Sequence, residues 1–302
     1  MPRMLLPLLA LLPLLSAGYA QDLEPRRWTH LPVGLNVASL KYGYTGGDIL
    51  LDPVLEIENA TTRAQTVVTS YSRSLDVLGA TGRLDAILPF QHASWKGDLS
   101  GEQASTTRDG MSDPWLRMSV NLLGAPALEG QAFRDYRRSH RTNTIVGAAV
   151  AVMLPLGQYD SSKLINLGQN RFIVRPQFGV VHSRGPWSYE LTGSAFLFTT
   201  NDEFRGDNEL AQDPLYMLQG HVIHTLPSKV WFSASAGYSW GGQTRQNGIE
   251  SDNETSQLLA ALSVGLPLNK SQALKFGYIH GDTQRRIGAD TQSLFVAWSF
   301  RF

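Results

Sequence analysis

The sequence predicts an all-β protein, a transmembrane antiparallel up-and-down β-barrel of about twelve strands, as found in bacterial outer membranes. The last strand is the clearest sign. From Leu294 to the terminal Phe302, large apolar side chains alternate with small or polar ones. A period of two places the two kinds on opposite faces of a strand. The last strand of a soluble β-sandwich would alternate in the same way. The N-terminus and the composition are therefore needed to distinguish the two folds.

The N-terminus predicts export. Residues 1–20 have the pattern of a cleaved signal peptide: Arg3 gives a positive start, Met4–Leu15 form an apolar core, and small residues precede the cut after Ala20. A membrane-spanning helix needs about 20 apolar residues, which neither this core nor any later segment provides. The mature chain, 21–302, is predicted to be one domain that is either a soluble exported protein or an outer-membrane barrel.

The composition favours the barrel. The 302 residues include 28 glycines, 10 tyrosines, 7 tryptophans and 12 phenylalanines, which is typical of β-barrels with aromatic side chains at the membrane interfaces. Without the signal, 25 basic and 26 acidic residues remain, so no basic excess suggests a nucleic-acid partner. Cysteine is absent, which excludes disulfides and thiolate metal sites. No cofactor-binding motif is present.

The alternation recurs along the chain, most clearly in eight segments. Four further segments show it weakly, and in one of them, 65–76, Tyr71 and Arg73 share a face, so that this strand cannot be oriented. The predicted strands are 35–44, 65–76, 82–95, 112–124, 142–154, 171–183, 186–199, 213–226, 229–242, 254–268, 272–282 and 290–302.

Short and long connections alternate between these strands. Outer-membrane barrels have short periplasmic turns and longer outer loops, which predicts outer loops at 45–64, 96–111, 155–170, 200–212 and 243–253. The connection 125–141 is long but falls on the periplasmic side. Its 127–138 portion is predicted to form a surface helix that exposes Arg134, Arg137 and Arg138.

Six short stretches resemble one family of outer-membrane proteins, labelled "putative MetA-pathway of phenol degradation" and related to the functional-amyloid secretion channel. They are Leu31–Asn36, Asn121–Leu128, Pro155–Asp160, Leu164–Gly168, Gln212–Tyr216 and Arg286–Asp290. The resemblance implies a twelve-stranded pore that acts as a transporter. The secretion channel has a coiled-coil extension before its barrel. Only Gln21–His30 precede the first matching stretch here, which speaks against a secretion role.

The predicted inward faces carry charged side chains that would line the lumen of a twelve-stranded barrel, which is narrower than a porin. Two interpretations remain open. A ring of charges could select small polar or anionic solutes, or the charges could pair, as Arg83 with Asp85 or Arg175 with Glu190, and fill the lumen. The pore-lining candidates are Lys41, Arg83, Asp85, Arg117, Arg171, Arg175, Glu190, Lys275 and Arg301.

Four bulky aromatic residues also fall inward: Phe196, Phe198, Trp231 and Phe295. They could form a path for aromatic compounds, or they could fill space.

The partners expected for such a barrel are outer-membrane lipid, lipopolysaccharide and a small-molecule solute. The acidic outer loops could contact lipopolysaccharide through divalent ions or bind Ca²⁺, although none matches an EF-hand loop. The terminal Phe302 predicts recognition by the barrel-insertion machinery. His221 and His224 would lie on opposite faces of a strand and cannot share a metal. Because no nucleophile motif is present, an enzyme is not predicted. A protein-secretion conduit and a plugged structural barrel remain alternatives.

Overall fold

The fold was analysed in a computed structural model that describes residues 23–50, 57–99, 102–163 and 165–302. The predicted signal peptide lies outside the described residues. The barrel strands are β1 (Asn36–Leu50), β2 (Ile57–Val77), β3 (Ala80–Leu99), β4 (Glu102–Met111), β5 (Trp115–Leu123), β6 (Thr142–Met153), β7 (Ile173–Arg184), β8 (Trp187–Phe198), β11 (Leu215–Thr225), β12 (Trp231–Gly241), β15 (Thr255–Pro267), β16 (Gln272–Thr283) and β17 (Gly288–Arg301).

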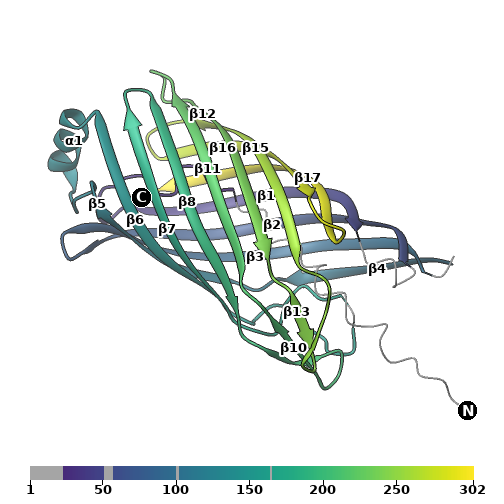
Figure 1. The fold of residues 1–302 in the computed structure, drawn as a ribbon. Coiled ribbons are helices and arrows are strands. Elements are labelled where there is room, and N and C mark those ends of the chain that lie inside the picture. Colours follow the sequence, from purple (N-terminus) through teal and green to yellow (C-terminus); the bar gives the residue numbers. More distant parts are fainter. Residues whose placement is uncertain (1–22, 51–56, 100–101, 164) are drawn as a thin grey trace, which may run out of the picture.

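These strands form a closed antiparallel barrel (Figure 1). The first strand, β1, pairs with β2 on one side and with β17 on the other, and each later strand pairs with its sequence neighbours in the barrel. Both β4 and β5 pair with β3, so they form one interrupted strand. In the described part of the chain the barrel therefore has twelve strands, which confirms the predicted fold class and number. No described helix is long and apolar enough to cross a membrane.

The alternation of side chains determines which face of each strand meets lipid. On β12, Phe232, Tyr238 and Trp240 are exposed outward, while Ser233 and Ser239 are buried in the lumen. The orientation of β2, which the sequence left open, follows from the same comparison: Tyr71 and Arg73 both point outward. Arg73 lies near the periplasmic end of β2, where a long basic side chain can reach the interface while its stem lies on lipid.

Charged substitutions at two depths of the lipid-facing wall test this orientation. Leu262 lies near the middle of β15 with 63% of its surface exposed, and Leu268 lies just past the periplasmic end of the strand with 53% exposed. We expect Leu262→Arg to lower the free energy of unfolding by about 2–4 kcal/mol and Leu268→Arg by about 0–1 kcal/mol, because the cost of a charge falls toward the interface. Denaturant titration of the barrel folded in lipid vesicles measures both. Equal losses at the two positions would contradict the assigned depth.

Two predicted outer loops are mostly strand. Much of 45–64 belongs to β1 and β2, and most of 96–111 belongs to β3 and β4. These extensions pair with each other beyond the lipid-facing residues. Most side chains there are polar, and the few apolar ones, such as Ile49 and Ala60, are buried in a small cluster, so the alternation that reveals a membrane strand is lost. The loops predicted at 200–212 and 243–253 contain a second, four-stranded sheet of β9 (Asn201–Phe204), β10 (Asn208–Gln212), β13 (Thr244–Gln246) and β14 (Ile249–Glu250).

The predicted periplasmic helix is present as α1 (Gly130–Ser139). Its three arginines are exposed as expected. Its aromatic side chains face the barrel instead: the rings of Phe133 and Tyr136 contact the imidazole of His30 with centroid distances of 4.8 and 5.3 Å.

The barrel wall is interrupted between β4 and β6. The latter ends at Met153, so β4 lacks a neighbouring strand on that side, and the connection 154–172 runs along its edge. Its backbone donates from Gln158 N to Met111 O at 2.8 Å. The buried carboxylate of Asp113, which lies between β4 and β5, accepts hydrogen bonds from Gly157 N at 2.8 Å and Gln169 N at 2.7 Å. This carboxylate therefore fastens both ends of the connection.

We expect Asp113→Ala to loosen the connection 154–172. Each buried N–H left without its acceptor costs about 1–3 kcal/mol. The half-exposed Lys163 lies in this connection, so trypsin should cut the variant after Lys163 faster than it cuts the parent, as read by mass spectrometry. Asp207→Ala removes an exposed acid from another outer loop and should leave the rate unchanged. Equal cutting of the Asp113 variant and the parent would contradict this role.

Candidate functional site

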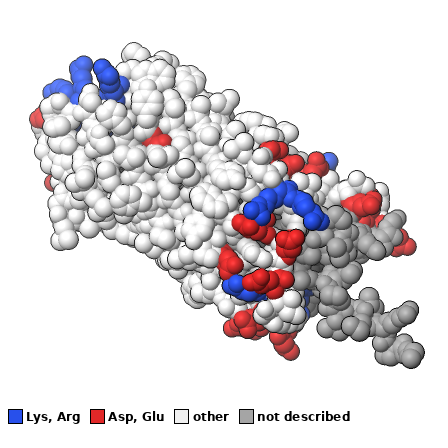
Figure 2. Space-filling view, viewed as in Figure 1, with Lys and Arg blue, Asp and Glu red and all other residues white. Residues whose placement is uncertain are grey.

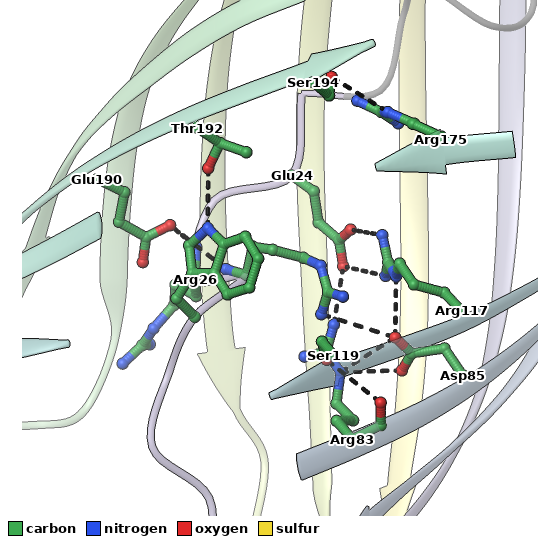
Figure 3. A network of polar contacts seen from close by, with 12 residues as sticks. Glu24, Arg26, Arg83, Asp85, Arg117, Ser119, Arg175, Glu190, Thr192 and Ser194 are labelled. Atoms are coloured by element: carbon green, nitrogen blue, oxygen red, sulfur yellow. Dashed lines mark hydrogen bonds and ion pairs between the residues drawn. The ribbon is translucent and has the colours of Figure 1, made fainter. Parts of the chain in front are cut away.

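The lumen contains a segment that belongs to no strand. Residues Leu23–His30, here called the lumen segment, precede β1 and lie inside the barrel (Figure 3). Trp28 is 1% exposed, and its indole Nε1 donates to Thr192 Oγ1 on β8 at 2.8 Å. A Cβ added to Gly147 or Gly179 would come within 2.2 and 2.0 Å of the indole ring. These two glycines therefore make the space that the tryptophan occupies.

An ion-pair network joins the lumen segment to the wall. Asp85 on β3 lies 2.9 Å from Arg83 Nε, 3.0 Å from Arg117 Nε and 3.6 Å from Arg27 Nη1 of the segment. Glu24 of the segment lies 2.9 Å from Arg117 Nη1. Two carboxylates thus face three guanidinium groups, so each acid is shared. The predicted pair of Arg83 and Asp85 is present, within a larger group that includes the segment.

The side chain of Glu190 on β8 binds the backbone of the lumen segment. Its Oε2 accepts hydrogen bonds from Arg26 N at 2.8 Å and Arg27 N at 3.3 Å. The suggested pairing of Glu190 with Arg175 is therefore wrong. The backbone N–H groups of a segment that the strand pattern did not include take the place of Arg175.

Arg175 contacts a hydroxyl group, a thioether and an aromatic ring of the wall. It donates from Nε to Ser194 Oγ at 3.3 Å, and its guanidinium lies 4.4 Å from the centroid of the Phe196 ring. Arg171 is placed similarly, 4.6 Å from the ring of Phe198, and bonds the side chain of Gln169. Both are cation–π contacts between a wall arginine and one of the inward aromatic residues.

The remaining candidates lie on other parts of the wall. Lys41 Nζ lies 4.5 Å from the centroid of Phe295, and Lys275 Nζ lies 5.3 Å from the same ring. Arg301 is exposed at the periplasmic end of β17. The nine candidates do not form one ring. Four of them, Arg83, Asp85, Arg117 and Glu190, bind the lumen segment. Another four, Lys41, Arg171, Arg175 and Lys275, lie against aromatic rings, and Arg301 lies apart from both groups.

An apolar cluster lies in the lumen next to the lumen segment. Leu23 belongs to it, and Gly237 gives it room, because a Cβ there would lie 2.8 Å from Leu23 Cδ2. The partly buried Trp115, Phe198 and Phe295 pack against it. The buried members are Leu23, Met153, Ile173, Phe196, Leu215, Met217, Leu259, Ala261 and Ile279.

Sequence reasoning missed the lumen segment. The signal that could have revealed it is the short stretch between the predicted signal peptide and the first strand, which holds Trp28 beside two adjacent arginines. A large apolar ring outside any strand needs a place to be buried. His221 and His224 lie on opposite faces as predicted, and the described residues hold no group of three His, Asp or Glu side chains that could bind a metal.

A closed antiparallel barrel with an apolar, aromatic outer wall and a charged lumen is an outer-membrane β-barrel. The chain belongs to the family described as "Putative MetA-pathway of phenol degradation", whose sequence profile matches residues 41–294.

Two solved structures show the same architecture. The COG4313 outer membrane channel from Pseudomonas putida F1 is 20% identical, with 93% of this chain and 100% of that chain covered and a TM-score of 0.77. The transport unit of the autotransporter AIDA-I from Escherichia coli is 10% identical, with 95% and 96% covered and a TM-score of 0.54. Comparison with curated protein sequences gives no match. At these identities the likeness concerns the fold.

Proposed function

We propose that the protein is a passive outer-membrane channel for small molecules, closed by the lumen segment and opened when that segment leaves its place. The proposal rests on the contacts that hold the lumen segment to the barrel wall. Its main polar contacts with the wall go through Asp85, Arg117, Glu190 and Thr192. Contacts of this kind can be exchanged for water at modest net cost, because water satisfies the same donors and acceptors.

The solute class follows from what the segment covers. Withdrawal of Leu23 would uncover the apolar cluster, with Phe196 and Met217 beside the guanidinium of Arg175. A surface of apolar rings and sulfur with few polar groups suits compounds that have an aromatic or moderately hydrophobic body. The phenol-degradation label of the family agrees with such solutes. The pore-lining candidates then act in two ways: Arg83, Asp85 and Arg117 hold the gate, and Arg171 and Arg175 contact the solute.

The remaining features of the proposal concern location. Residues 1–20 direct export and are removed, the outer wall lies in outer-membrane lipid with the acidic loops toward lipopolysaccharide, and the insertion machinery recognises the strand that ends at Phe302.

A reversible clamp tests the proposal. The chain has no cysteine, so Leu23→Cys together with Gly237→Cys introduces one defined pair. Leu23 Cδ2 lies 2.8 Å from the Cβ position of residue 237, so side chains at these two positions meet. Conductance of the refolded double variant is measured in planar bilayers, oxidised and then reduced. We expect the oxidised barrel to stay closed and the reduced barrel to open, while each single variant is insensitive to reductant.

Block of the ion conductance by added phenol, measured on the reduced double variant, tests the solute class. Conductance that is unaffected by oxidation would overturn the gate. Reductant-dependent conductance that phenol does not reduce would leave the gate in place and overturn the solute class. A barrel that stays silent when reduced would favour the plugged structural alternative.

A further inference from the structure

A water-accessible vestibule opens at the periplasmic end of the barrel. Its volume is about 1060 Å³, and it lies between the lumen segment and the periplasmic turns. Aromatic and imidazole side chains line it, among them Trp231, Tyr136 and His224. Water occupies about 30 Å³ per molecule, so the vestibule can hold a hydrated small solute while the lumen segment is in place.

The vestibule is lined by cationic side chains from six separate parts of the chain. One comes from the lumen segment, one from α1, one from the connection after α1, two from the turns before β12 and β16, and one from the end of β17. These residues are Arg26, Arg137, Arg141, Lys229, Lys270 and Arg301. Because the six parts are spread around the barrel mouth, the charges surround the space and do not form a patch on one side.

The acidic side chains do not cancel this charge. Among the described residues that line the vestibule, Glu190 is the single acid, and its Oε2 already accepts two backbone N–H groups. His30 adds no charge at neutral pH. Burial lowers the pKa of its imidazole, a hydrogen bond to the Pro126 carbonyl opposes this, and the charge of Arg137 lowers the pKa further. The vestibule wall is therefore strongly positive.

The other end of the barrel, which carries the outer loops, has a net negative charge. Figure 2 shows basic side chains gathered at the end that carries α1 and mainly acidic ones, with some basic ones among them, at the outer loops, with few charges on the wall between. Exposed acids of the outer sheet and its loops include Asp202, Glu203, Asp207, Glu209 and Glu250. With 26 basic and 26 acidic residues overall, the charge is separated along the barrel axis. An anion is thus attracted to the periplasmic mouth and repelled from the outer one.

We propose that the periplasmic vestibule is a binding site for small multivalent oxyanions, carboxylates or phosphates, that enter from the periplasm. Guanidinium and ammonium groups are the side chains that bind such oxygens, and a ring of like charges concentrates the counter-ion within it. The site is open while the lumen segment is in place, so this proposal does not depend on the channel proposed above.

Equilibrium binding tests the site without requiring the barrel to conduct. Citrate, a tricarboxylate, and inorganic triphosphate are titrated separately into the folded, detergent-solubilised mature protein at low salt in a calorimeter. We expect saturable binding of one anion per barrel for at least one of them, weakened as salt rises, because the attraction is screened. Binding of only one probe identifies the oxyanion class.

Charge reversal locates the site. Arg137→Glu combined with Arg301→Glu should weaken binding about tenfold or more, since each substitution replaces an attraction for the anion by a repulsion. Arg134→Glu combined with Arg138→Glu is the matched control, because both residues are exposed on the same helix but do not line the vestibule. If the change at Arg301 impairs folding of β17, Arg137→Glu with Lys229→Glu replaces it.

Absence of saturable heat with both probes would overturn the proposal. So would binding that the vestibule and control variants weaken equally, because the anion would then respond to the overall charge of the helix end and not to this site.

Discussion

A mature chain that begins at Leu31, and so lacks the lumen segment, is expected to conduct ions in planar bilayers by an order of magnitude or more above the full mature chain. The segment occupies the centre of the barrel, where Trp28 and Leu23 are almost fully buried. A twelve-stranded barrel is wider than the eight-stranded barrels whose interiors side chains alone can fill. Removal of the segment should therefore leave a continuous water path.

The control for this truncation keeps the segment and alters another periplasmic element. Arg134→Ala and Arg138→Ala change exposed side chains of α1 and should leave conductance at the parent level. The twelve strands should form in every variant, because the segment contributes no strand to the barrel; retained heat-modifiable migration on gels checks this. A truncated barrel that folds but conducts no more than the parent would show that wall side chains close the lumen.

Replacement of Asp85 by alanine is expected to have the largest effect of any single lumen substitution. Asp85 is 2% exposed and lies against Arg27, Arg83 and Arg117. Without it, Glu24 alone faces three guanidinium groups. Breaking a buried charge group by removing one partner costs about 3–5 kcal/mol. Part of this cost can be avoided if Arg27 moves into water, so the lumen segment should leave and conductance should rise while unfolding in vesicles shifts to lower denaturant.

Two further variants show whether the effect is specific. Asp109→Ala removes an exposed acid on β4 that contacts His92 and should change neither stability nor conductance appreciably, since exposed pairs contribute about 0–1 kcal/mol. Arg27→Met in the Asp85→Ala background should recover part of the lost stability, because it removes one uncompensated charge; the double-mutant cycle gives the coupling between the two residues. Additive effects would show that Arg27 and Asp85 do not interact.

The sequence by itself determined the barrel, its strand number and the orientation of most of its wall. These follow from the alternation of neighbouring residues, as between Phe232 and Ser233, which is a local property: lipid accepts one kind of side chain and the lumen another. The same alternation predicts that Asp85, Arg117 and Glu190 point inward, and all three are buried. It failed where lipid is absent, in the outer extensions of β1 to β4, because most residues there are polar and the few apolar ones, such as Ile49 and Ala60, form no regular period.

Only the tertiary structure decided what fills the lumen and which charges meet. Trp28 fits against Gly147 and Gly179, and Glu190 binds the backbone of Arg26, across separations of more than one hundred residues. A period of two tells which way a side chain points from its strand, but it does not tell which strand lies opposite. That depends on closure of the barrel and on the path of a segment outside every strand, which bring together wall residues that are distant in sequence.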